Sequence, residues 1–163
     1  MRKKKIYLDT SVISYLRQED APSEMQTTLE FWEILKSGKY SIYISEVTTG
    51  ELTQCPEPKR TELFTLLEEL TYTEIKISDE EEIAALSIEI QNQGIISPKN
   101  TNDRLHIAAA MFSGCNVIVS WNFKHLVNIK TIDGVRVIAA LNNLNPIDIY
   151  SPNMLIERSD FDG

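Results

Sequence analysis

The sequence predicts an α/β fold built on a central, mainly parallel sheet. Short apolar runs typical of buried strands alternate along the chain with longer segments whose apolar residues recur at helical spacing. Such alternation is typical of parallel strands joined by crossover helices. The chain has 163 residues, of which 42% are hydrophobic and 25% charged, and this suits one globular domain with its own core.

The predicted strands are short and mostly apolar. They are Lys5–Leu8, Tyr40–Ile44, Thr73–Ile77, Asn116–Val119 and Ile147–Tyr150. In an open parallel sheet, ligands bind outside the carboxyl ends of the strands. Asp9 directly follows the first strand, and Ser120 and Asn122 follow the fourth. We therefore expect these three residues at the binding edge of the sheet.

The predicted helices fill the intervals between the strands. Pro22 suits the first turn of a helix over Ser23–Ser37, which ends before Gly38. Either Ser45 or Thr48 can cap the helix that follows the second strand. The remaining helical segments are Ser11–Arg17, Lys59–Leu70, Asp79–Gln93, Asn102–Ser113, a short turn near Phe123–Leu126, and Ile132–Asn143. Residues 1–151 are predicted to form a single domain, followed by a polar tail over residues 152–163.

Composition excludes several classes of protein. The formal net charge of −8 argues against a protein that simply coats nucleic acid, although an enzyme could meet phosphate through a bound cation. No apolar run approaches the ~20 residues needed to span a membrane. The start, MRKKKIYLDT, lacks the features of a signal peptide. Cys55 and Cys115 show no metal-like or disulfide spacing, so we expect a cytoplasmic protein.

Four short stretches place an oxygen-bearing side chain at the end of a predicted element. They are YLDTS with Asp9, SEVTTGEL with Glu51, TNDRLHIAAA with Asp103 and VSWNFKHL with Asn122. Carboxylates held close together repel each other unless a cation compensates. Hard oxygen ligands suit Mg²⁺ or Mn²⁺ rather than zinc, for which His and Cys ligands are too few. Such an ion lowers the pKa of a bound water and neutralises a phosphodiester during hydrolysis.

Each of the four residues also has an ordinary structural explanation. Asp9 can cap the helix that starts near Ser11, and Glu51 completes the capping-box pattern Thr48-x-x-Glu51. Asp103 suits the first turn of a helix because of the helix dipole, and Asn122 can simply start a turn. It is the combination of the four that favours a metal site.

The same stretches resemble the motifs of the PIN-domain family and, within it, the toxin ribonucleases of VapC type. IYLDTSVIS resembles the first motif, and ISEVTTGEL resembles the second, in which Glu51 is the acidic residue. NDRLHIAAA resembles the third motif with Asp103, and IVSWNFKHL the fourth, where a strand ends in Ser or Thr before an acidic residue two places on. The resemblance runs from about Lys5 to Ser151.

The resemblance implies a three-layer α/β/α fold and cleavage of RNA that depends on Mg²⁺ or Mn²⁺. In bacterial members it often implies a toxin silenced by a small antitoxin, and a homodimer. The fourth motif usually offers an aspartate, whereas this sequence has Asn122. An amide oxygen carries no charge, so we expect either that a second metal ion binds less well or that the site works with one ion.

We expect Asp9 and Asp103 to ligate the ion directly or through water. Glu51 would ligate it or accept a proton from the attacking water, and Asn122 would complete the shell through water. Hydrolysis would leave 5′-phosphate and 3′-hydroxyl ends, a polarity that the resemblance implies.

Neighbouring polar residues have two possible roles each. The hydroxyls of Thr10 and Ser120 would donate to a carboxylate or a phosphate, or else cap local structure. Arg104 and Lys124 would contact backbone phosphate or be solvated surface charges. His106, one helical turn after Asp103, would orient that aspartate or bond the backbone.

Two other functions stay open. Asp9 at the end of a strand also suits an aspartate-based phosphatase, but Ser11 stands where haloacid-dehalogenase-like enzymes place a second aspartate. A non-catalytic module that binds RNA or a protein is the other alternative, and the acidic composition and Asn122 favour it slightly. Trp121 would either pack in the core or stack on a base.

Overall fold

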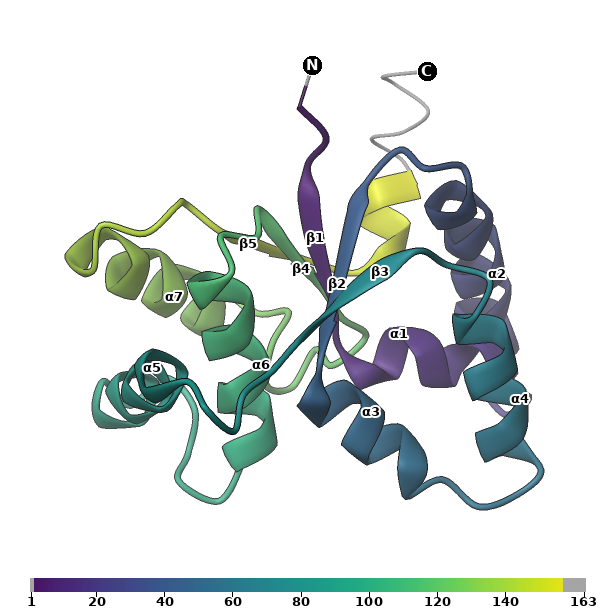
Figure 1. The fold of residues 1–163 in the computed structure, drawn as a ribbon, viewed down its shortest axis with the longest axis horizontal. Coiled ribbons are helices and arrows are strands. Elements are labelled where there is room, and N and C mark those ends of the chain that lie inside the picture. Colours follow the sequence, from purple (N-terminus) through teal and green to yellow (C-terminus); the bar gives the residue numbers. More distant parts are fainter. Residues whose placement is uncertain (1, 157–163) are drawn as a thin grey trace.

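The computed structural model describes residues 2–156 and contains a five-stranded parallel sheet in the order β3-β2-β1-β4-β5 (Figure 1). Ile6 of the central strand lies opposite Ile42 on one side and Val117 on the other. The strands are β1 (Lys5–Leu8), β2 (Ser41–Ser45), β3 (Tyr72–Ile75), β4 (Val117–Val119) and β5 (Asp148–Tyr150).

Helices cover both faces of the sheet, so the predicted three-layer α/β/α fold is confirmed. One layer lies on the right in Figure 1 and contains α1 (Thr10–Ser14), α2 (Pro22–Lys36), α3 (Glu46–Thr53) and α4 (Lys59–Leu67), with the 3-10 helix η1 (Tyr15–Arg17) after α1. The other layer contains α5 (Glu81–Asn92), α6 (Thr101–Phe112) and α7 (Ile129–Leu141). No helix among residues 2–156 has the length and apolar character needed to cross a membrane.

The central strand β1 is buried on both faces because successive side chains of a strand point in opposite directions. Ile6 and Leu8 belong to the core beneath α1–α4, whereas Tyr7 belongs to the core beneath α5–α7. A strand covered on both faces reads as a continuous apolar run, and this explains why the sequence predicts it well.

The observed element bounds differ from the predicted ones in a few places. The chain near Phe123–Leu126 forms turns rather than a helix, and α7 begins at Ile129 because the Asn128 side chain caps it by accepting from the amide of Thr131. Residues 152–156 are helical, with Leu155 buried in the core beneath α1–α4, so the start of the predicted polar tail packs against the domain. The rest of that tail, residues 157–163, lies outside the described residues.

Candidate active site

The candidate site lies at the carboxyl edge of the sheet, where the direction of strand order reverses. From β1 the chain builds outward to β2 and β3 on one side, and β4 and β5 lie on the other side. Such a switch point opens a crevice between neighbouring strands. Asp9 follows β1 and Ser120 follows β4, and the amide of Asp9 donates to the Val119 carbonyl at 3.1 Å. The two predicted residues therefore lie next to each other.

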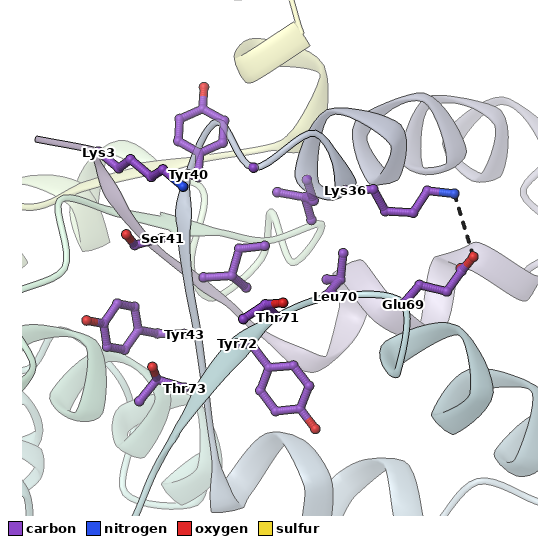
Figure 2. A pocket seen from close by; sticks show the side chains of 13 residues that line it. Lys3, Lys36, Tyr40, Ser41, Tyr43, Glu69, Leu70, Thr71, Tyr72 and Thr73 are labelled. Carbon is purple, nitrogen blue, oxygen red and sulfur yellow. Dashed lines mark ion pairs between the residues drawn. The ribbon is translucent and has the colours of Figure 1, made fainter. Parts of the chain in front are cut away.

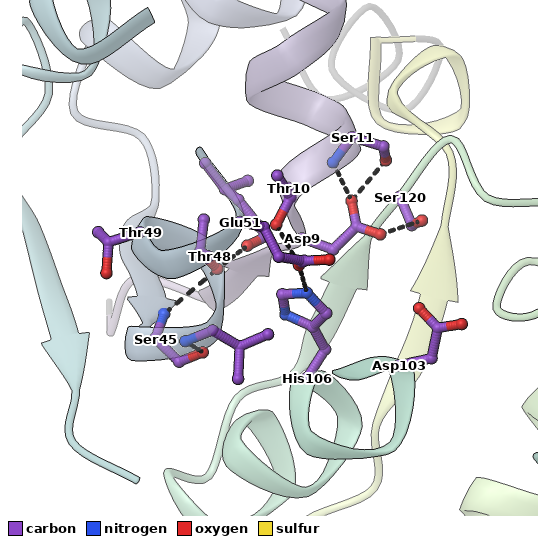
Figure 3. A network of polar contacts seen from close by, with 12 residues as sticks. Asp9, Thr10, Ser11, Ser45, Thr48, Thr49, Glu51, Asp103, His106 and Ser120 are labelled. Atoms are coloured by element: carbon purple, nitrogen blue, oxygen red, sulfur yellow. Dashed lines mark hydrogen bonds and ion pairs between the residues drawn. The ribbon is translucent and has the colours of Figure 1, made fainter. Parts of the chain in front are cut away.

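Asp9 is held by three hydrogen bonds from neutral donors. Its Oδ1 accepts from the amide of Ser11 at 3.0 Å and from the Ser11 hydroxyl at 2.5 Å, and its Oδ2 accepts from the Ser120 hydroxyl at 2.6 Å (Figure 3). Only 4% of Asp9 is exposed. Burial raises the pKa of this carboxyl, although nearby His106 and the hydroxyl donors oppose the rise. Asp9 thus caps α1, as one alternative proposed, and is also a buried acid at the switch point.

Glu51 faces Asp9 from α3. Ser45 caps α3 and shares a capping box with Thr48, so Glu51 lies beyond the first turn and takes no part in the cap. Its Oε1 accepts from the Thr10 hydroxyl at 2.6 Å and lies 2.7 Å from Nε2 of His106. Burial favours a higher pKa for Glu51, but His106 and Thr10 outweigh it and hold the pKa below its usual value. Glu51 is therefore ionised at neutral pH.

Tyr7 and His106 form a buried support behind Glu51. Because an ionised carboxylate can only accept, Nε2 of His106 carries the proton in this contact. The other ring nitrogen, Nδ1, lies 2.5 Å from the Tyr7 hydroxyl, which in turn lies 2.7 Å from Oγ of Ser45. Burial raises the pKa of Tyr7, so the phenol keeps its proton and can donate it in this contact. His106 therefore orients Glu51, not Asp103 as its place in the sequence suggested.

Asp103 belongs to a second pair at the same edge. It lies in the first turn of α6, and its Oδ2 is 2.7 Å from Nδ1 of His125. Oδ1 of Asn122 accepts from the amide of His125 at 3.0 Å, so Asn122 starts the turn that carries this histidine. Figure 3 shows Asp103 to one side of Asp9, Glu51 and His106, with no interaction drawn to any of them.

Comparison with known proteins assigns the family. The model of the PIN domain family matches residues 6–125, which is most of the chain.

This chain belongs to the PIN domain family.

A solved structure with the same fold is the crystal structure of VapBC2 from Rickettsia felis bound to a DNA fragment from their promoter. The TM-score is 0.57 at 15% identity, and the alignment covers 90% of this chain and 98% of that chain. At this identity the similarity establishes the fold alone. No curated protein matches the chain.

Two residues expected at the site serve the structure of this PIN domain instead. Arg104 is 6% exposed, and its guanidinium donates to the carbonyls of Ser97 and Pro98 at 2.7 and 2.8 Å. The Arg104 guanidinium therefore stabilises the loop before α6, and its burial leaves it poorly placed to contact a phosphate. The Trp121 indole donates to the Thr28 hydroxyl at 2.8 Å and packs in the core, so the packing alternative is correct.

The Thr10 hydroxyl donates to Glu51 and the Ser120 hydroxyl donates to Asp9. Each hydroxyl therefore donates to a carboxylate, which is one of the two acceptors that the sequence suggested. Lys124 is exposed at the surface. Sequence reasoning missed the support from Tyr7 and the pairing of His125 with Asp103. Both histidines were visible in the sequence, but their partners lie on other elements.

The carboxylates of the PIN domain offer hard oxygen donors of the kind that Mg²⁺ and Mn²⁺ prefer. In the part of the chain that the structure describes, no three His, Cys, Asp or Glu side chains are arranged as a ready metal site. The acids form two groups, Asp9 with Glu51 and Asp103 with His125. The donor chemistry fits a divalent cation, because the hydrogen bonds that Asp9 accepts among the described residues come from neutral amide and hydroxyl groups and none comes from a Lys or Arg.

A groove of about 450 Å³ lies at the opposite edge of the sheet (Figure 2). The starts of β2 and β3 line it, together with Lys3 and with Lys36 and Glu69, which form an ion pair at 3.6 Å. None of the predicted site residues lines this groove, so its size does not make it the candidate site.

Proposed function

We propose that this PIN domain is a metal-dependent endoribonuclease of the VapC toxin type, which hydrolyses RNA phosphodiesters with Mg²⁺ or Mn²⁺. The observation that carries the proposal is the proximity of Asp9 and Glu51 at the switch point of the sheet. Each raises the cost of ionising the other, and no Lys or Arg side chain among the described residues hydrogen-bonds either carboxylate. A divalent cation from solution would offset this repulsion.

Asp9, Glu51 and Asp103 would hold the ion, and Asn122 would complete its shell through water. When bound, the ion supplies charge neutralisation at the phosphodiester and a lower pKa for the attacking water. Glu51 then accepts the proton of that water, since its low pKa keeps it ionised and Thr10 and His106 fix its orientation. The water oxygen would bond to phosphorus as the bond from phosphorus to the 3′ oxygen breaks, and the leaving 3′ oxygen would take a proton from solvent, which gives 5′-phosphate and 3′-hydroxyl ends.

Further parts of the proposal concern partners. Lys124 would contact a backbone phosphate of the substrate. A small antitoxin protein would bind and silence the enzyme, the functional unit would be a homodimer, and the protein would act in the cytoplasm. The similarity in fold to a protein of the VapBC2 structure supports an antitoxin partner.

Cleavage of a single-stranded RNA tests the proposal. Wild type, Glu51→Gln and Asp103→Asn are incubated with Mg²⁺, with Mn²⁺ and with EDTA. Asp79→Asn serves as a matched control because Asp79 is exposed and takes no part in the hydrogen bonds of the site. We expect cleavage by wild type and the control only with metal, with 5′-phosphate ends, and a loss of at least 100-fold in the two site variants.

The alternatives give different results in the same experiment. Equal cleavage by every sample, or cleavage in EDTA, indicates a contaminating nuclease and refutes the proposal. RNA binding without turnover identifies a non-catalytic module. A phospho-aspartate trapped at Asp9 identifies a phosphatase.

A further inference from the structure

A pocket of about 320 Å³ lies beside the candidate site and is lined by three lysines, Lys99, Lys124 and Lys130. They come from the loop before α6, the turn after β4 and the first turn of α7. None of the ten residues that line the pocket is acidic. In a chain with a net charge of −8, three lysines without an acid around one pocket are a local reversal of charge.

These lysines are also unpaired in the part of the chain that the structure describes. Each is exposed, and none takes part in a salt bridge. By contrast, Lys36 pairs with Glu33, and Arg136 pairs with Asp148. Three ammonium groups that repel one another without compensation form a surface suited to an anion.

Two helix starts add to the positive potential of the pocket. Asn100 and Asn128, the residues that precede α6 and α7, both line it. The amides of a first helical turn have no partner within the helix and carry partial positive charge. The Asn100 side chain makes no capping hydrogen bond, so it leaves the start of α6 uncapped. The pocket therefore combines three charged groups with two helix starts, of which the start of α7 is capped by Asn128 and the start of α6 has no side-chain cap.

The pocket is continuous with the candidate site through one residue. His125 lines the pocket, and its Nδ1 contacts Oδ2 of Asp103 at 2.7 Å. An extended strand that passes Asp103 would therefore bring its next phosphates to the lysines.

We infer that this pocket binds backbone phosphate of the single-stranded RNA substrate, away from the bond that is cut. The inference rests on the proposed function, because it treats the pocket as part of the same RNA path. The pocket supplies affinity rather than chemistry, since its lysines contact neither Asp9 nor Glu51 in the structure. Its recognition is of charge and not of base identity.

The test compares two triple variants in which the same amount of positive charge is removed. Lys99, Lys124 and Lys130 are changed to Gln in one, and Lys3, Lys4 and Lys39 in the other. The control lysines are exposed and precede β1 and β2, so they lie at the opposite edge of the sheet. Both triples carry Glu51→Gln to prevent cleavage. Binding of a fluorescent single-stranded 12-mer RNA is measured by anisotropy across a range of salt concentrations.

We expect the pocket triple to bind RNA roughly tenfold more weakly, and its logarithmic salt dependence to be shallower by about 2, at ~0.7 for each phosphate that the lysines no longer neutralise. The control triple should keep the affinity and the slope of the parent. Equal behaviour of the two triples, in either direction, would overturn the inference. Circular dichroism checks that all variants are folded.

Failure of the inference differs from failure of the proposed function. In a pocket triple that keeps Glu51, cleavage of the 12-mer with an unchanged KM refutes RNA binding by the pocket but is consistent with the proposed nuclease activity. If the wild type never cleaves RNA but binds it in a way that depends on the pocket lysines, the proposed nuclease activity is refuted and RNA binding by the pocket is supported.

Discussion

Replacing Asp9 by Asn should make the protein more stable while removing the proposed nuclease activity. Asn is as good an N-cap as Asp, so α1 keeps its cap. The carboxylate accepts three hydrogen bonds from neutral donors, and the loss of charge forfeits roughly 3 kcal/mol if each bond weakens from a charged to a neutral one. However, removal of an ionised carboxylate from water costs several kcal/mol. The raised pKa of Asp9 indicates that this cost of burial exceeds the stabilisation from the three hydrogen bonds.

We therefore expect Asp9→Asn to raise the free energy of unfolding by about 1–2 kcal/mol at pH 7 without divalent metal. The gain should depend on pH. Well below pH 4 the carboxyl is protonated in both the folded and the unfolded wild type, so its charge costs nothing. As the pH rises, the unfolded chain ionises first because its pKa is lower, and the wild type loses stability until the folded carboxyl has also ionised.

Urea unfolding between pH 4 and pH 8 measures this difference, with EDTA and then with Mg²⁺. Mg²⁺ should stabilise the wild type and leave Asp9→Asn unchanged, because binding to the folded state alone adds to stability. Asp79→Asn, an exposed control, should follow the wild type. The reasoning would be refuted if Asp9→Asn were less stable than wild type at pH 7. It would also be refuted if the difference in unfolding free energy between the two proteins did not become smaller toward pH 4.

Three further predictions concern the support of the site and the core. Glu51→Gln should lower the single-turnover cleavage rate at least 100-fold and change the unfolding midpoint little, because glutamine can still accept from Thr10. Tyr7→Phe should cost about 1–2 kcal/mol in urea unfolding, since it leaves Nδ1 of buried His106 unpaired, and an effect below about 0.5 kcal/mol would contradict this hydrogen bond. Gly134→Ala should cost about 1–3 kcal/mol, because the new Cβ would lie 2.6 Å from the Ile95 side chain, and adding Ile95→Val should recover part of the loss.

The fold and the positions of two candidate residues at the sheet edge could be predicted because their signals are local. A buried strand reads as an apolar run, and the residue after it falls at the edge where parallel strands end. Asp9 and Ser120 are such residues, and the structure places them in hydrogen-bond contact.

The position of Glu51 was harder to predict because the sequence is compatible with two different N-cap residues, Ser45 and Thr48. With Thr48 as cap, Glu51 belongs to a capping box, whereas with Ser45 as cap it faces the site. The choice depends on where β2 ends, and propensity fixes that only to within a few residues.

The hydrogen-bonded support behind Glu51 could not be predicted from the sequence, because its residues Tyr7 and His106 are far apart along the chain. Tyr7 and His106 are separated by 99 positions, and nothing local links a strand tyrosine to a helix histidine. Arg104 failed for a related reason. Its position beside Asp103 suggested a phosphate contact, but the loop of Ser97 and Pro98 folds over it and takes its donors.

The sheet divides the candidate active site between two separately packed bodies. Asp9 and Glu51 are anchored in the layer of α1 and α3, while Asp103 is anchored in the layer of α6 (Figure 1). The gap between the two acidic groups is thus set by how far apart two hydrophobic cores hold their helices. Because His106 of α6 also holds Glu51, a repacked residue deep in either core that moves α6 would displace Asp103 from Asp9 and strain the Glu51 contact, and would thereby abolish the proposed hydrolysis.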